Sequence, residues 1–198
     1  MTLANKLTLA RLVLAVFTFA CLWAQRPAWY AVGLALYVTA TLTDWIDGYV
    51  ARSTGQTSPF GALADPIADK VLVLGALIAF LRVPELEIPS WAVFLIVLRE
   101  LVIGGLRALA GVSGQVLSAN RGGKWTMGVQ SASIISILAL LVWRHHASWP
   151  IPGWALGAAG PLIALCAAVS VASGVHYIYG ARGLIQHSWN APKRRNRE

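Results

Sequence analysis

The sequence predicts an all-α membrane protein that crosses the bilayer six times. Of its 198 residues, 57% are hydrophobic and only 12% are charged, which is too apolar a balance for a water-soluble domain. Each transmembrane helix needs ~20 apolar residues, so the length suits one compact domain of about six spans with short connections. We expect a single transmembrane domain over residues 1–190, followed by a basic cytoplasmic tail at residues 191–198.

Six apolar segments define the expected helices. They are separated by short stretches with turn-forming residues, such as AQRPAW after the first segment and RSTGQTSPFG after the second. The first segment could also be a secretory signal peptide, but Arg11 lies well inside it and the remaining spans would be odd in number. We therefore expect it to be a helix of the mature protein. The segments cover residues 7–25, 28–50, 60–83, 89–110, 124–143 and 152–183.

The positive charges predict the orientation of these helices. With an even number of spans, both chain ends lie on one side, together with thirteen of the sixteen lysines and arginines; the other side has Arg26, Arg82 and Arg144. By the positive-inside rule, both termini face the cytoplasm from a multi-pass position in the cell membrane. The net charge of +8 does not indicate nucleic acid binding, because aromatic and basic residues do not alternate in the tail. The tail is better placed near anionic lipid headgroups.

Half of the eight acidic residues lie near the expected cytoplasmic ends of the second and third helices. Asp44 and Asp47 are three residues apart in one helix, and Asp65 and Asp69 are four apart in the next, so each pair shares one helical face. Helices joined by a short loop are antiparallel neighbours, which lets the four carboxylates meet at one depth. Their charges would repel unless a cation neutralises them. Ligation by oxygen alone favours Mg²⁺ or Mn²⁺.

Small and basic residues accompany the aspartates. Gly48, Ala51 and Gly61 permit a close approach of backbone or ligand, and the Arg52 guanidinium suits phosphate oxygens. Together these residues predict phosphoryl chemistry on a diphosphate at the membrane surface. Each residue alone could instead be a helix cap, a snorkelling side chain or part of a salt bridge. A cation carrier or channel is the alternative from another class, but carboxylates at one face do not continue a path across the midplane.

The spacing of these residues resembles a known family signature. From Asp44 to Asp69 the chain reads D-x2-D-G-x2-A-R-x8-G-x3-D-x3-D, which is similar to the motif of the CDP-alcohol phosphatidyltransferases, integral membrane enzymes of phospholipid synthesis. The resemblance implies six transmembrane helices, a homodimer, and a metal-dependent transfer of a phosphatidyl group. The group would move from CDP-diacylglycerol to an alcohol, with release of CMP.

The resemblance also implies roles for individual residues. All four aspartates would be metal ligands, and Asp69 would also take the proton from the acceptor hydroxyl. The segment NKLTLAR resembles an N-x2-T-x2-R element that helps to bind the donor, although the usual neighbouring proline is missing. The expected residues for CDP-diacylglycerol binding are Asn5, Thr8, Arg11, Gly48, Arg52, Ser58 and Gly61.

Two further segments, RELVIGGLR and GGKWTMGVQ, resemble those of family members that make phosphatidylglycerophosphate. Basic residues suit a phosphorylated acceptor such as glycerol 3-phosphate. The second segment departs from the family pattern, since Thr126 and Met127 stand where a lysine and a threonine usually follow. Other acceptors are therefore alternatives, namely phosphatidylglycerol in a cardiolipin synthase or an inositol phosphate in a phosphatidylinositol phosphate synthase. The expected residues for binding the acceptor phosphate are Arg99, Arg107, Lys124 and Arg182.

Overall fold

The computed structural model describes residues 3–54, 59–112, 121–146 and 152–190, and for some residues near the helix ends it describes only the backbone. Helices make up nearly all of these ranges, which contain no strand. The predicted all-α fold is therefore confirmed. The elements are α1 Leu3–Trp23, α2 Pro27–Thr54, α3 Pro59–Phe80, the 3-10 helix η1 Pro84–Leu86, α4 Ser90–Val112, α5 Arg121–His146, α6 Gly153–Gly157 and α7 Ala159–Asn190.

Each of the first five apolar segments corresponds to one long helix, with ends that differ from the prediction by a few residues. The sixth segment is divided into the short α6 and the long α7. Pro161 in the first turn of α7 has no N–H, so the helical hydrogen-bond pattern lacks one donor at this point. The pattern resumes at Leu162, whose N–H donates to the carbonyl of Ala158 at 3.0 Å. A proline inside an apolar run therefore explains the division.

The turn between α1 and α2 is fixed by a side chain. Gln25 has a φ of 51°, in the left-handed region, and Pro27 begins α2 at a position where its missing N–H costs nothing. The Gln25 amide donates a hydrogen bond to the carbonyl of Arg82, just beyond the end of α3. The Arg82 guanidinium in turn lies 4.1 Å from the ring centre of Trp23. These contacts hold the α1–α2 turn against the end of α3.

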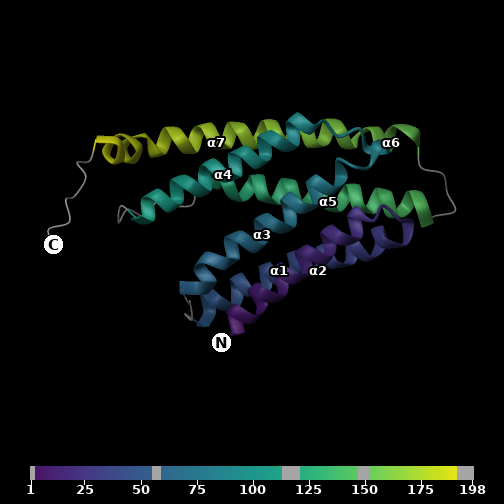
Figure 1. Ribbon diagram of the computed structural model, residues 1–198, viewed down its shortest axis with the longest axis horizontal. Helices are drawn as coiled ribbons and strands as arrows, with labels where there is room; N and C mark the ends of the chain where they lie inside the picture. The colour runs from purple at the N-terminus through teal and green to yellow at the C-terminus, as the bar shows by residue number, and fades with distance from the viewer. Residues whose placement is uncertain (1–2, 55–58, 113–120, 147–151, 191–198) are drawn as a thin grey trace.

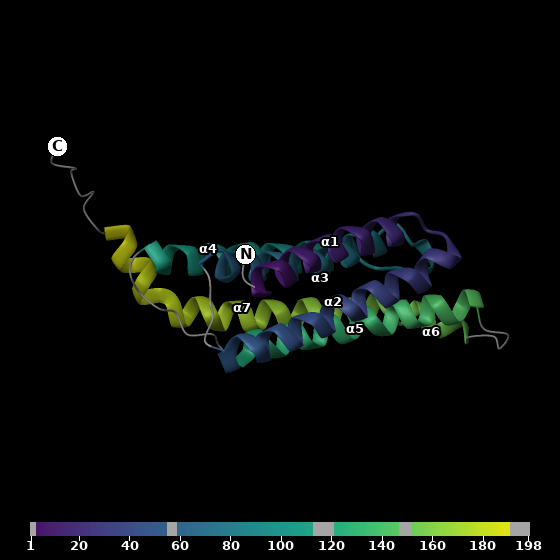
Figure 2. The ribbon, with the colours of Figure 1, turned by 90° about the horizontal axis from the view of Figure 1, so that it is seen from below.

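The long helices form two layers. Figure 2 shows α1, α3 and α4 in one layer and α2, α5 and α7 in the other. Within and between the layers, α1 packs against both α2 and α3, α4 packs against α7, and α5 packs against α2 and α7. In Figure 1 the start of α1, the end of α2, the start of α3 and the end of α7 all point toward the left. The helix directions thus bring the start of α1, the end of α7 and the aspartate-bearing helix ends to the same end of the bundle.

The buried core and the outer surface are both apolar. Core side chains come from several helices and include Leu77, Phe80, Ile96, Leu138 and Ile163. On the outside, large apolar side chains stay exposed: Phe94 is 63% exposed, Leu101 67% and Leu165 60%. Soluble monomers rarely expose extensive apolar surface. The described surface is therefore chemically suited to contact with lipid.

Two helical stretches of the described chain are long and apolar enough to cross a membrane, namely Trp125–His145 and Trp154–Gly183. Shorter apolar stretches run over Thr8–Trp23 and Lys70–Phe80. Charged residues interrupt the apolar runs of the remaining helices, as α4 shows with Arg99, Glu100 and Arg107. The expectation of six spans therefore stays a prediction.

Candidate active site

The first predicted aspartate contacts the first helix. Nη1 of Arg11 on α1 lies 2.8 Å from Oδ1 of Asp44 on α2, and the Arg11 side chain is 1% exposed whereas that of Asp44 is 47% exposed. Thr8, about one turn before Arg11, is also buried. The packing of α1 on α2 thus brings Arg11 of the N-terminal element to the aspartate motif. It also gives the Asp44 carboxylate a cationic partner.

The other motif residues lie on the same helices. Among the described helices α2 and α3 are in slight direct contact, whereas α1 packs extensively against both of them. The backbone is helical at each motif position that the structure describes, and Ser58 lies outside the described residues. The residues whose helical backbone is described without a side chain are Asn5 on α1, Asp47, Gly48 and Arg52 on α2, Gly61, Asp65 and Asp69 on α3, and Lys124 on α5.

Metal binding is not tested by the side chains that the structure describes. Among them, no group of three or more His, Cys, Asp or Glu residues could hold an ion. Only Asp44 of the four predicted ligands belongs to this set. Its carboxylate is half-exposed and forms an ion pair with the Arg11 guanidinium, and the four-aspartate metal site stays a prediction.

An ion network joins α3 to α4 directly after the last motif position. Lys70 follows Asp69 in sequence, and its Nζ donates a hydrogen bond to the backbone carbonyl of Glu100 at 3.1 Å. The same Nζ lies 3.6 Å from Oε2 of Glu100. The other carboxylate oxygen, Oε1, accepts a hydrogen bond from Nη1 of Arg99. One carboxylate therefore connects two cations, one from α3 and one from its own helix.

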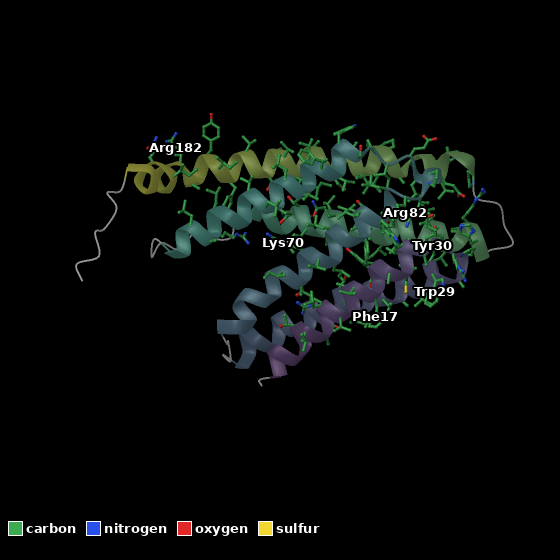
Figure 3. All side chains as sticks on the ribbon, viewed as in Figure 1. Phe17, Trp29, Tyr30, Lys70, Arg82 and Arg182 are labelled. Atoms are coloured by element: carbon green, nitrogen blue, oxygen red, sulfur yellow. The ribbon has the colours of Figure 1, made fainter. Side chains whose placement is uncertain are left out.

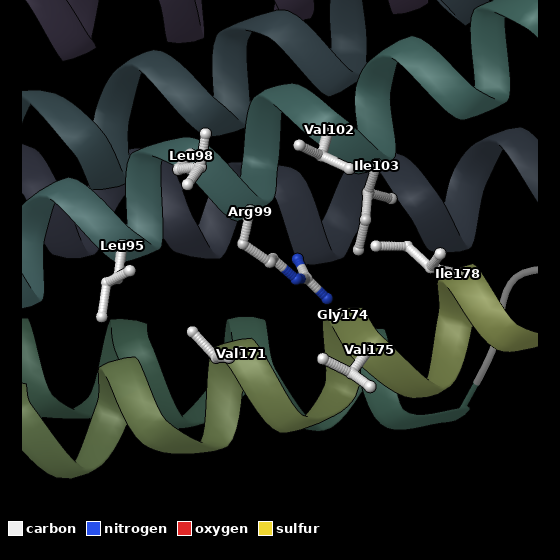
Figure 4. A pocket seen from close by; sticks show the side chains of 9 residues that line it. All are labelled: Leu95, Leu98, Arg99, Val102, Ile103, Val171, Gly174, Val175 and Ile178. Atoms are coloured by element: carbon white, nitrogen blue, oxygen red, sulfur yellow. The ribbon is translucent and has the colours of Figure 1, made fainter.

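Arg99 extends from this network toward α7. Its Nη2 lies 3.5 Å from Oγ of Ser173, and its side chain is 8% exposed. Nε of Arg99 is buried and has no hydrogen-bond partner among the described residues. Figure 4 shows the guanidinium between α4 and α7, in a pocket of about 160 Å³ whose other lining residues are apolar or glycine. A buried guanidinium with an unused donor is suited to an anionic ligand.

The remaining predicted cations lie closer to the cytoplasmic end expected from the sequence. Arg107 on α4 is exposed, and its Cζ lies 5.8 Å from the ring centre of Tyr177 on α7. Arg182 on α7 is also exposed and lines a second pocket of about 270 Å³. Figure 3 places Arg182 far from Arg82, toward the other end of the bundle. Arg99 and Arg107 both contact α7, which agrees with the shared helical face that their spacing of eight residues predicts.

Sequence reasoning gave no role to several residues of this region. In the sequence, Lys70 is one of thirteen cations on the expected cytoplasmic side, and Glu100 belongs to the segment RELVIGGLR. A signal was present for Glu100, because it is the only acidic residue of the predicted apolar segments apart from the four aspartates. Ser173 and Gly174 had no such signal, since small residues are common throughout the apolar segments.

Comparison with known proteins identifies the family. The family model described as CDP-alcohol phosphatidyltransferase matches residues 1–172. The chain belongs to the CDP-alcohol phosphatidyltransferase family. It is 38% identical over 152 residues to a Bacillus subtilis protein named CDP-diacylglycerol–glycerol-3-phosphate 3-phosphatidyltransferase, with 71% of this chain and 76% of the relative covered.

Other relatives cover more of the chain. A Mycobacterium tuberculosis protein named probable phosphatidylglycerophosphate synthase is 38% identical over 179 residues, covering 89% of this chain and 79% of the relative. A Salmonella paratyphi A protein with the same name as the Bacillus subtilis relative is 34% identical over 182 residues, covering 89% and 93%. The predicted family is therefore confirmed, and its match covers the aspartate motif and the Arg99 region alike.

Two groups of contacts organise the candidate site of this CDP-alcohol phosphatidyltransferase. One joins Arg11 to Asp44 between α1 and α2, and the other joins Lys70, Glu100 and Arg99 between α3, α4 and α7. Helix α3 connects the groups, because it carries the second aspartate pair and Lys70 comes directly after that pair. The described contacts thus place one carboxylate of the aspartate motif beside Arg11, and the two cations Lys70 and Arg99 beside Glu100, where they can attract an anionic ligand.

Proposed function

We propose that this enzyme transfers the phosphatidyl group of CDP-diacylglycerol to sn-glycerol 3-phosphate, giving phosphatidylglycerophosphate and CMP in phospholipid synthesis. The observation that carries the proposal is the identity of 34–38% to relatives that bear the names of this activity, over most of both chains. The cations of α4 and α7 support it, because glycerol 3-phosphate brings its own phosphate dianion to the site. A carrier or channel function is not favoured by any of these relatives.

For the donor half, the proposal assigns the motif residues to CDP-diacylglycerol and a divalent metal. Asp44, Asp47, Asp65 and Asp69 would hold Mg²⁺ or Mn²⁺, which supplies neutralisation of the diphosphate when it is bound. The Asp44 carboxylate is half-exposed and therefore accessible to an ion, and the Arg11 guanidinium beside it can contact the phosphates of the donor. The residues assigned to the rest of the donor are Asn5, Thr8, Arg11, Gly48, Arg52, Ser58 and Gly61.

In the reaction, Asp69 accepts the proton of the glycerol 3-phosphate hydroxyl as that oxygen attacks. A new bond forms to the phosphorus that carries diacylglycerol, and the bond from this phosphorus to the CMP oxygen breaks. Arg52 lies on α2, the helix that carries the first aspartate pair, and Arg11 on α1 pairs with Asp44, so both guanidinium groups can orient the phosphates of the donor. The protein's main contributions are thus the alignment of two phosphate-bearing substrates and the removal of one proton.

For the acceptor half, the proposal assigns Arg99, Arg107, Lys124 and Arg182 to the phosphate of glycerol 3-phosphate. Arg99 has the strongest structural support, because it is buried, has an unused Nε donor and points between α4 and α7. Arg107 and Arg182 are exposed, and each lies on a helix that forms the Arg99 pocket. A site with several fixed cations distinguishes a phosphorylated acceptor from a neutral polyol.

The proposed environment is the cell membrane, crossed by six helices with both termini and the active site on the cytoplasmic side. The exposed apolar side chains of the described helices and the shared end of both termini support this topology. The family resemblance adds a homodimer. Labelling of single cysteines from either side of intact vesicles tests the topology, and a cross-linking experiment in the same vesicles tests the dimer.

The activity is tested with purified protein in detergent micelles that contain CDP-diacylglycerol and Mg²⁺. Glycerol 3-phosphate, phosphatidylglycerol, inositol phosphate and glycerol are offered separately, while CMP release and the lipid product are followed. We expect CMP and phosphatidylglycerophosphate with glycerol 3-phosphate only, and no product after EDTA until Mg²⁺ is restored. If a lipid product forms with another acceptor, the protein is the family member that uses that acceptor. If no CMP is released with any acceptor, the enzyme assignment is wrong.

A further inference from the structure

Glu100 is the one acidic side chain of α4, and both of its carboxylate oxygens face cations. Oε1 accepts a hydrogen bond from Arg99, and Oε2 lies 3.6 Å from Nζ of Lys70. We propose that Glu100 is a positioning residue for the acceptor: it holds the Arg99 guanidinium and the Lys70 ammonium in place so that Arg99 presents its free Nε to the acceptor phosphate. This inference rests on the proposed function and assigns a role to a residue outside the aspartate motif.

The charge balance of the network supports the role. Arg99 and Glu100 are both more than nine-tenths buried, and a buried charge is stable only when it is paired and hydrogen-bonded. Without the carboxylate, the two cations would repel each other at short range in a medium of low dielectric constant. With it, the three groups carry a net charge of about +1. The carboxylate thus lets two cations stand together near one phosphate.

The shape of α4 supports the role independently of its charges. Gly104 lies one turn beyond Glu100, and a Cβ built at Gly104 would lie 3.1 Å from Nζ of Lys70. The absence of a side chain at Gly104 therefore leaves room for the Lys70 ammonium beside Glu100. A Cβ built at the next residue, Gly105, would meet nothing within 4 Å. Of the two adjacent glycines, only Gly104 borders the ammonium.

The position of the network relates it to the acceptor rather than to the donor. Arg99 reaches Ser173 on α7, and a Cβ built at Gly123 on α5 would lie 3.8 Å from its Nη2. The described donor contact, between Arg11 and Asp44, involves α1 and α2 instead. Lys70 directly follows the proposed base on α3, so Glu100 connects the turn that carries the base to the arginine that would bind the phosphate. Loss of this connection should weaken acceptor binding selectively.

The main test is the Glu100→Gln variant of the full-length enzyme in micelles. Gln keeps the size of the side chain but removes its charge. We expect the KM for glycerol 3-phosphate to rise at least about tenfold, while the KM for CDP-diacylglycerol stays within about twofold of the wild type. Glu100→Asp keeps the charge and should recover part of the acceptor KM. Lys70→Gln should raise the KM for glycerol 3-phosphate by a smaller factor in the Glu100→Gln variant than in the wild type, because the two residues act together.

A matched pair of glycine variants tests the same idea without removing a charge. Gly104→Ala should raise the acceptor KM, because its methyl group displaces the Lys70 ammonium, whereas Gly105→Ala should leave both KM values unchanged. If Glu100→Gln does not fold, as judged by size-exclusion chromatography in detergent, this pair decides the question. Equal KM values for the two glycine variants would then overturn the inference.

The outcomes separate the inference from the function on which it rests. A wild-type enzyme that releases no CMP with glycerol 3-phosphate would contradict the proposed function. An active wild type, together with a Glu100→Gln variant whose acceptor KM is unchanged, would overturn the positioning role alone. A parallel rise of both KM values, or a lower kcat with unchanged KM values, would show that Glu100 acts only on the fold and would also overturn it.

Discussion

Replacement of Gly174 by alanine tests where the Arg99 side chain lies between α4 and α7. A Cβ at position 174 would be 3.0 Å from Cγ of Arg99, whereas carbon atoms pack best at ~3.5–4.0 Å. The arginine stem would have to move by about half an ångström to restore that separation. Such overpacking costs ~1–3 kcal/mol, against a gain of ~1 kcal/mol for alanine over glycine in a helix. The variant should therefore be less stable than the wild type by up to about 2 kcal/mol.

Thermal unfolding in detergent and acceptor kinetics measure the two consequences. Each kcal/mol lost lowers the Tm of a chain of this size by ~2–4 °C. Displacement of the guanidinium should also raise the KM for glycerol 3-phosphate about tenfold, which corresponds to a loss of ~1.4 kcal/mol in binding. The matched control is Gly180→Ala on the same helix, where the added Cβ meets nothing within 4 Å and should not lower the Tm. If Gly174→Ala is as stable as the control and keeps the acceptor KM of the wild type, the placement of Arg99 is wrong.

Three further predictions concern other parts of the chain. Asp69→Asn should reduce CMP release ~10²–10⁴-fold or more without loss of folded protein, because the amide cannot accept the acceptor proton; near-normal turnover would exclude Asp69 as the base. Gly160→Ala should lower the Tm, since its Cβ would lie 2.6 Å from the Glu87 carbonyl, whereas Gly157→Ala, which meets nothing, should not. Arg144→Gln removes an exposed ion pair with Glu85, whose Oε2 lies 3.8 Å from Nε of Arg144, at the far end of the bundle. An exposed pair contributes no more than ~1 kcal/mol to stability, so the Tm should change little and the activity should not change.

The helices could be predicted from the sequence because their signals are local. An apolar run of ~20 residues specifies a helix largely independently of its neighbours, and all six runs correspond to long helices. The division of the last run was missed, although Pro161 carried the information, because the run stays apolar on both sides of the proline. The extension of α5 to His146 was also missed, since polar residues at a helix end resemble the start of a loop.

The contacts of the acceptor region could not be predicted in the same way. Lys70 and Glu100 are thirty residues apart, and Arg99 and Ser173 are separated by seventy-four. Spacing within one helix says which residues share a face, but not which face another helix will cover. The sequence could therefore indicate that Arg99 and Arg107 share one helical face. Only the packing of the helices shows that α7 covers this face.

By itself, the sequence determined the all-α class, the positions of six long helices and the family, because composition, apolar runs and the motif from Asp44 to Asp69 are read along the chain. The tertiary structure decided which charges meet: Arg11 with Asp44, and Lys70 with Glu100 and Arg99. It also decided where the missing side chains of Gly104 and Gly174 leave room for those cations. The physical reason is that pairing of charges and close packing depend on distances between helices, which the packing of the helices sets and no single segment contains.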